Sequence, residues 1–122
     1  MSKNFLDKFT DICQETEWEL EECGKGVKLS HYLRASCQKF VIMPTGDSGD
    51  TEDIIRSMVA YYRAFDVEEY VTDKLIAKRN GASDIPALND LIMDAEEIPC
   101  LVRRLLVNLG VKMENSWGNC IC

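Results

Sequence analysis

The sequence predicts an α+β fold, with an N-terminal helix, a three-stranded antiparallel sheet, and then three helices packed on one sheet face. Three observations predict it. Apolar residues recur at helical spacing at the start of the chain, alternate with polar ones over about residues 16–43, and return to helical spacing from residue 50 onward. No linker separates two hydrophobic regions, so residues 1–110 are expected to form a single domain and residues 111–122 a cysteine-containing tail.

The first helix is predicted over residues 4–13, where four side chains share one stripe: Phe5, Phe9, Ile12 and Cys13. From Thr16 the period changes to two, because Trp18 and Leu20 alternate with glutamates, and this predicts a first strand that ends at Gly24-Lys-Gly26. Two further strands are predicted over residues 27–33 and 39–43. Together the three strands form a predicted meander.

A second helix is predicted to begin at the pair Asp50 and Asp53, which has the spacing of an N-terminal cap, and to extend to Ala64 or Phe65. Asp66 is expected to cap a third helix. That helix should end at Asn80-Gly81, because glycine readily adopts the left-handed conformation that follows many helices.

The fourth helix is predicted to begin between Asp84 and Pro86, because its apolar stripe then continues for more than twenty residues to Gly110. Pro99 lies inside this stripe. Proline lacks a backbone donor and clashes with the preceding turn, so a kink or a break is expected between Glu97 and Cys100.

The composition restricts the class of protein. Of 122 residues, 46% are apolar and 29% charged, as in globular domains, and no apolar run approaches a membrane span. The polar N-terminal residues predict a cytosolic protein without a secretory signal. The net charge of −7 disfavours direct binding to nucleic acid, which requires clustered cations, and favours a basic protein partner.

The acidic residues are the candidate partner-binding residues. If the first strand is extended from its start, alternate carboxylates lie on one face about 6.6 Å apart: Glu15, Glu17, Glu19 and Glu21, with Glu22 next to them. A second cluster follows the sheet: Asp47, Asp50, Glu52 and Asp53. The row has two interpretations, an ordinary polar outer face or a surface for a basic groove. Because duplex DNA carries one charge per about 1.7 Å, the row alone could imitate DNA only in part.

Six cysteines occur, at positions 13, 23, 37, 100, 120 and 122, and without an export signal they are expected to be thiols. Zinc sites need converging thiolate and imidazole ligands. The strand topology could bring Cys13, His31 and Cys37 together, with Cys120 or Cys122 as a fourth ligand; the alternative is that these cysteines only pack. His31 is the only histidine and has no evident orienting group, so an enzyme is not expected.

Four segments of the chain carry a resemblance to a known class of proteins: Phe65-Asp-Val-Glu-Glu-Tyr-Val, Ala77-Lys-Arg-Asn-Gly, Asp84-Ile-Pro-Ala-Leu and Leu91-Ile-Met-Asp-Ala-Glu-Glu-Ile. They resemble small acidic proteins of phages and mobile elements in gut Firmicutes, and among these the Cas9-inhibiting anti-CRISPR proteins of the type II-A class. The resemblance extends from the acidic strand to Ile98. Pro99-Cys100 and the cysteine-rich tail depart from the unbroken last helix that is usual there.

This resemblance implies a non-enzymatic inhibitor that acts in the cytoplasm of an infected bacterial host. Such a protein would bind a basic surface of a Cas9-type nuclease and block its engagement with the guide RNA or with target DNA. The alternative is a zinc-dependent or homodimeric protein-interaction module without a nuclease target. The residues themselves leave the nuclease domain, the blocked step and the oligomeric state open.

Overall fold

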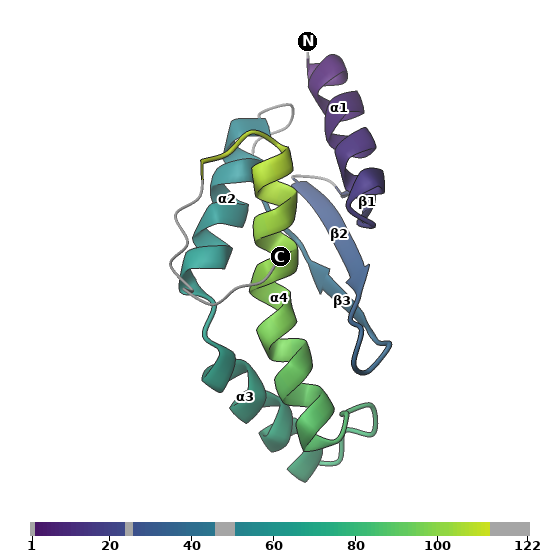
Figure 1. Ribbon diagram of the computed structural model, residues 1–122, viewed down its shortest axis with the longest axis vertical. Helices are drawn as coiled ribbons and strands as arrows, with labels where there is room; N and C mark the ends of the chain where they lie inside the picture. Colours follow the sequence, from purple (N-terminus) through teal and green to yellow (C-terminus); the bar gives the residue numbers. More distant parts are fainter. Residues whose placement is uncertain (1, 24–25, 46–50, 113–122) are drawn as a thin grey trace.

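The computed structural model describes residues 2–23, 26–45 and 51–112 (Figure 1). The elements along the chain are α1 (Ser2–Glu15), β1 (Glu19–Cys23), β2 (Gly26–Tyr32), β3 (Lys39–Ile42), α2 (Thr51–Ala64), α3 (Val67–Arg79) and α4 (Leu88–Asn108). The three strands form one antiparallel sheet in the order β1-β2-β3. The predicted α+β class and the order of the elements are confirmed.

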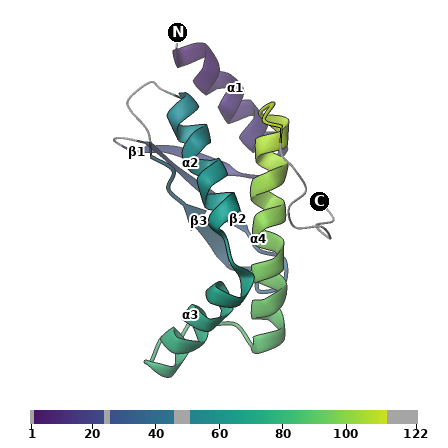
Figure 2. The ribbon, with the colours of Figure 1, turned by 90° about the vertical axis from the view of Figure 1, so that its left-hand side faces the viewer.

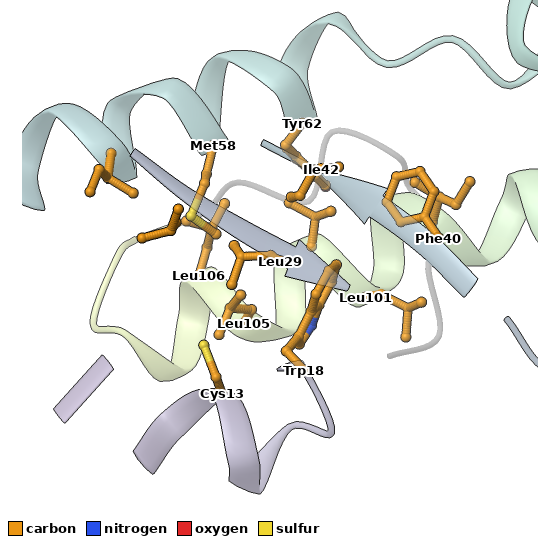
Figure 3. Packing of buried hydrophobic residues seen from close by; sticks show 14 of the residues in the cluster. Cys13, Trp18, Leu29, Phe40, Ile42, Met58, Tyr62, Leu101, Leu105 and Leu106 are labelled. Carbon is orange, nitrogen blue, oxygen red and sulfur yellow. The ribbon is translucent and has the colours of Figure 1, made fainter. Parts of the chain in front are cut away.

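One face of the sheet forms the core. Leu29 pairs with Leu20 on β1 and with Ile42 on β3, and these side chains turn toward the helices. Figure 3 shows Leu29 among Met58 of α2 and Leu105 and Leu106 of α4, all of them fully buried. Burial of these apolar side chains stabilises the contact between the sheet and the helix layer.

Helix α3 differs from the other two helices that follow the sheet. Figure 2 shows it projecting from the body of the molecule beside the first half of α4. None of its residues is buried, although Tyr70 packs against the edge of the core, where its ring lies 5.7 Å from that of Phe65. The expected packing of helices on the sheet therefore describes α2 and α4 better than it describes α3.

Helix α3 begins and ends as the sequence predicts, and α4 ends as predicted but begins at Leu88, later than the predicted start between Asp84 and Pro86. Asp66 caps α3 by accepting a hydrogen bond from the Glu69 backbone N–H at 3.2 Å. Gly81 and Gly110 both have positive φ, and in each case the following residue donates back across the last turn, as in Val111 N–H to Leu106 O at 3.0 Å. These contacts are Schellman motifs, which satisfy carbonyls that the helix leaves unpaired.

The first strand begins later than predicted, at Glu19 rather than Thr16. Helix α1 continues to Glu15 and ends in a third Schellman motif, in which Trp18 N–H donates to Cys13 O at 2.7 Å and Glu17 adopts the left-handed conformation with φ 65°. This position is usually occupied by glycine. Because a glutamate stands here instead, the sequence carries no glycine signal for the end of the helix. The buried Trp18 side chain favours this turn, because it anchors the chain in the core.

The expected break at Pro99 is absent, since α4 runs without interruption through it. Proline removes only one backbone hydrogen bond. Ile98, Leu101 and Val102 are buried around Pro99, and their packing holds the turns on either side of it against the sheet. In the part of the chain that the structure describes, no helix has both the length and the apolar character needed to cross a membrane.

Candidate protein-binding surface

The sheet face opposite the core is the candidate binding surface, and we call it the outer sheet face. Its side chains alternate with the core residues of the same strands. They are Glu19 and Glu21 of β1, Lys28, Ser30 and Tyr32 of β2, and Lys39 and Val41 of β3 with Met43 directly after it. The register places Glu21 opposite Lys28, and Tyr32 opposite Lys39.

An ion pair crosses this face from one edge strand to the other. The Lys39 Nζ of β3 lies 3.0 Å from Glu19 Oε1 of β1, so the two side chains meet over the central strand. This arrangement accounts for the 6% exposure of Ser30, which lies between them on β2. The hydrogen bond to Glu19, followed by the negative charge of that carboxylate, raises the pKa of Lys39. Lys39 Nζ also lies 5.5 Å from the centre of the Tyr32 ring.

The predicted row of four carboxylates is not present. Glu15 is the last residue of α1 and Glu17 lies in the turn that follows, so only Glu19 and Glu21 are on the outer sheet face. Lys28 and Lys39 lie on the same face, and the second of them is paired with Glu19. The charges that the described strands contribute to this face therefore balance.

Exposed apolar side chains are the feature that distinguishes the outer sheet face. Met43 is 60% exposed, Tyr32 58% and Val41 40%. Single exposed apolar residues are common on protein surfaces. Three exposed apolar residues together on one small sheet face are, in contrast, typical of contact surfaces, where tyrosine and methionine are enriched.

The other acidic candidates lie away from this face. Glu22 is exposed, but its position pairs with the buried Val27, so it lies on the core side of the sheet near its edge. Glu52 and Asp53 are in the first turn of α2, and Asp53 Oδ1 accepts from Arg56 Nη1 at 2.7 Å. Asp47 and Asp50 are outside the described residues. The structure thus does not gather the predicted acids into one patch.

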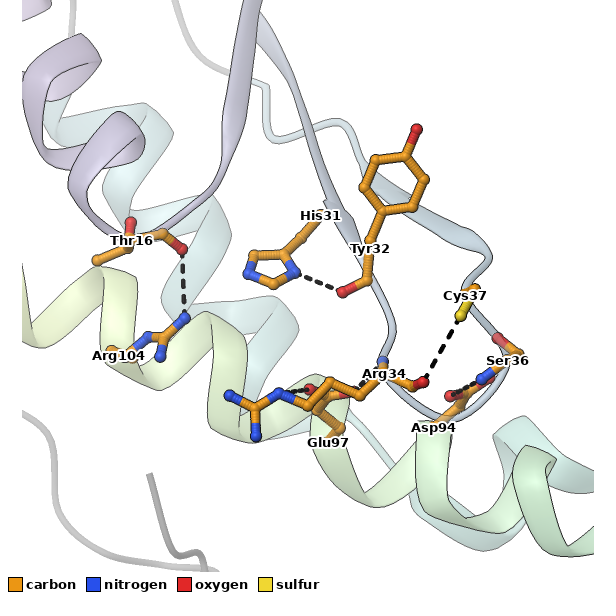
Figure 4. Close-up of polar contacts among 9 residues, drawn as sticks. All are labelled: Thr16, His31, Tyr32, Arg34, Ser36, Cys37, Asp94, Glu97 and Arg104. Atoms are coloured by element: carbon orange, nitrogen blue, oxygen red, sulfur yellow. Dashed lines mark hydrogen bonds and ion pairs between the residues drawn. The ribbon is translucent and has the colours of Figure 1, made fainter.

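The turn between β2 and β3 is attached to α4 by two carboxylates (Figure 4). Glu97 accepts from the Arg34 backbone N–H at 2.9 Å, and the buried Asp94 accepts from the Ser36 N–H at 3.3 Å. Because these residues are three apart on α4, both reach the same turn. The two contacts fix the end of the sheet that carries Tyr32 relative to the helix layer.

Asp94 also influences a neighbouring side chain on α3. Burial, and secondarily the charge of Asp94, raises the pKa of Tyr70. Asp94 therefore lies at the junction of α3, α4 and the sheet. The sequence pattern does not reveal this role, since an aspartate in a helix usually faces solvent.

The three predicted metal ligands occupy different environments. Cys13 is in the core beside Trp18 (Figure 3), and burial raises the pKa of its thiol to about 12. His31 is buried on the sheet, where its Nδ1 lies 2.7 Å from Tyr32 O, and Cys37 is an exposed turn residue with φ 61°. Among the described side chains, no three of the ligand types converge to hold a metal ion. Cys120 and Cys122 lie outside the described residues.

The expectation that all cysteines are thiols is wrong for Cys100 of α4, which is disulfide-bonded. Cys13 and Cys37 are free.

Sequence reasoning missed the apolar residues of the outer sheet face. Tyr32, Val41 and Met43 do alternate with core residues, but alternation alone does not tell which residues of a strand face solvent. The signal that could have found them is the presence of large apolar residues in both alternating sets of positions on β2 and β3.

Comparison with protein-family models, curated proteins and solved structures finds no match to this chain. A functional assignment consequently depends on the residues and their geometry.

Proposed function

We propose that the chain is a non-enzymatic inhibitor that binds a Cas9-type nuclease through its outer sheet face. It would block the binding of the guide RNA or of target DNA by the nuclease. The observation that carries the binding role is the exposure of Tyr32, Val41 and Met43 on the sheet face that no described helix covers. The choice of nuclease comes from the resemblance of the segments between residues 65 and 98 to anti-CRISPR proteins.

The contact would use apolar and polar groups in different ways. Burial of Tyr32 and Met43 against a partner would supply affinity, since aromatic and flexible apolar side chains commonly dominate interface energetics. Lys39 is held by Glu19 and lies over the Tyr32 ring, so part of this face is ordered before binding. Such preorganisation lowers the entropic cost of association.

The acidic character of the chain would act at longer range. A net charge of −7 favours encounter with a basic nuclease surface and speeds association at low salt. The exposed Glu15, Glu17 and Glu22 border the sheet and would contribute to this steering. Mimicry of a DNA strand by β1 is not part of the proposal, because Glu15 and Glu17 do not lie on that strand.

The test is a binding and cleavage assay with a purified type II-A Cas9, in which the protein is added before or after the guide RNA. We expect stable binding and inhibited cleavage of target DNA. The order of addition would identify the blocked step. If the protein neither binds Cas9 nor slows cleavage at any order of addition, the nuclease is not its target.

A pair of variants tests the surface. Replacing Tyr32 and Met43 together by serine should weaken binding at least tenfold, mainly through faster dissociation. The matched control is Val107→Ser, which changes a residue of α4 that is 46% exposed and lies outside the sheet. Equal affinity of the double variant, the control and the parent protein would remove the outer sheet face from the mechanism.

A further inference from the structure

Helix α3 has the features of a helix that lacks a partner. It has 13 residues, none of them buried, and it projects from the molecule (Figure 2). An isolated helix of this length is marginal in water and usually depends on tertiary packing. The side of α3 toward α4 is only half-buried: Val67, Tyr70, Val71, Lys74 and Ala77.

The opposite side of α3 carries an exposed stripe, which we call the α3 outer stripe: Glu68, Glu69, Thr72, Leu75, Ile76 and Arg79. Their spacing of three or four residues places them on one side of the helix. Leu75 is 40% exposed and Ile76 50%. A helix face that only meets water has no need for two adjacent large aliphatic side chains.

The charges of α3 are separated along its axis. Glu68 and Glu69 are in the first turn, and Lys78 and Arg79 in the last. Within the part of the chain that the structure describes, none of these four side chains forms an ion pair. The helix dipole accounts for the separation within one chain. The same separation makes the stripe complementary to itself when a second α3 lies antiparallel to it.

We propose that two copies of the chain associate through the α3 outer stripe, with their α3 helices antiparallel about a two-fold axis near Asp73. In this arrangement Glu68 and Glu69 of each copy face Arg79 of the other, and Thr72, Leu75 and Ile76 pack at the centre. Such an isologous contact requires a patch that is complementary to itself, and the charge order of α3 meets this requirement.

A second copy is favoured over another partner because both signs of charge are present at matching distances from the centre of the stripe. The interface would be small, since a helix of 13 residues is about 20 Å long. It would fall below the roughly 800 Å² per partner of a standard stable complex. The dimer should therefore dissociate on dilution. It uses a different surface from the outer sheet face, so either proposal can fail alone.

Two charge-reversal variants test the arrangement by sedimentation equilibrium. The basic-stripe variant carries Glu68→Lys and Glu69→Lys, and the acidic-stripe variant carries Arg79→Glu. Each variant alone should associate at least tenfold more weakly than the parent, because like charges then face each other at both ends of the contact. An equimolar mixture of the two should recover a dimer.

Recovery in the mixture separates the proposed contact from damage to the helix, because a helix that is only destabilised in each variant is not repaired by mixing. Ile76→Ser should also weaken the dimer, whereas Val107→Ser, at an exposed position on α4, should leave it unchanged. A parent protein that stays monomeric at every concentration would overturn the proposal. So would a dimer that resists both stripe variants, or a mixture that remains monomeric.

Discussion

Lys39 and Glu19 join the two edge strands of the sheet by a 3.0 Å contact that passes over the central strand. The pair determines the character of the outer sheet face. It neutralises one of the two glutamates that β1 places there, and it holds a lysine beside Tyr32. The face is thereby a mixed apolar and charged surface rather than an acidic one.

The first prediction concerns the titration of Lys39. Its pKa should lie above the ordinary value of 10.5, because the hydrogen bond to Glu19 and the charge of Glu19 favour the ammonium form. The stabilisation from this pair should be fully present below the lysine pKa of the unfolded chain, and should be lost as the pH rises through the raised folded value. NMR titration of the lysine side chains measures it. Glu19→Gln should return the pKa toward 10.5, and an unchanged value in this variant would contradict the assigned cause.

The second prediction concerns the end of α1. Glu17→Gly should raise the free energy of unfolding by about 0.5–1 kcal/mol, because glycine adopts the left-handed conformation without the steric cost that glutamate bears. Glu17→Ala is the matched control, since alanine removes the charge but keeps the cost. Denaturant unfolding measures both variants. If both gain equally, the benefit comes from removing the charge at the helix C-terminus and not from the backbone.

The third prediction concerns the attachment of the β2–β3 turn to α4. Asp94→Ala should lower the free energy of unfolding by about 1–3 kcal/mol, because it leaves the Ser36 N–H without its acceptor and opens a space at the junction with α3. Glu96→Ala alters an exposed acid on the same helix and should change stability by less than about 0.5 kcal/mol. Urea unfolding of both variants distinguishes the two residues. Equal small effects would show that the Asp94 contact adds little.

The fourth prediction concerns the two free thiols. At neutral pH an alkylating reagent should modify the exposed Cys37 and leave Cys13 unmodified in the folded protein. Cys13 is inaccessible, and burial raises its pKa to about 12, so almost no thiolate is present. Mass spectrometry of digested, labelled protein measures both sites. Labelling in denaturant is the control, since Cys13 should then react.

The same raised pKa has a consequence for alkaline stability. The Cys13 thiol is uncharged in the folded core, while its unfolded counterpart ionises near 9. Its contribution to stability should therefore be present below pH 9 and decline as the pH rises toward the folded value. Cys13→Ala should show a weaker decline over this range than the parent protein does.

The predictable part of the fold is the part encoded in local patterns. Asp66 capped α3 as expected, and Gly81 and Gly110 ended their helices, because capping side chains and left-handed glycines act within a single turn. The end of α1 could not be placed from such signals, since Glu17 adopts the same conformation without being glycine. The placement of the four-glutamate row depended on that boundary, so an error of three residues removed two of its members.

The candidate site was less predictable than the fold. The sequence supplies Glu19, Lys39 and Tyr32, but only strand register brings them together, because Lys39 follows Glu19 by 20 residues. The zinc hypothesis illustrates the same limit. Cys13 and Cys37 are each only a few residues from a strand in the sequence, yet Cys13 is in the core and Cys37 is on an exposed turn.

The sequence by itself determined the α+β class, the order of the helices and strands, and the acidic net charge, since all three follow from residue type and short-range periodicity. The tertiary structure alone decided that the outer sheet face is neutralised by its own lysines, that Asp94 attaches a turn, and that α3 stands without buried residues. The physical reason is that these features depend on how distant segments pack. Burial and charge pairing are properties of the space between elements, which local spacing does not specify.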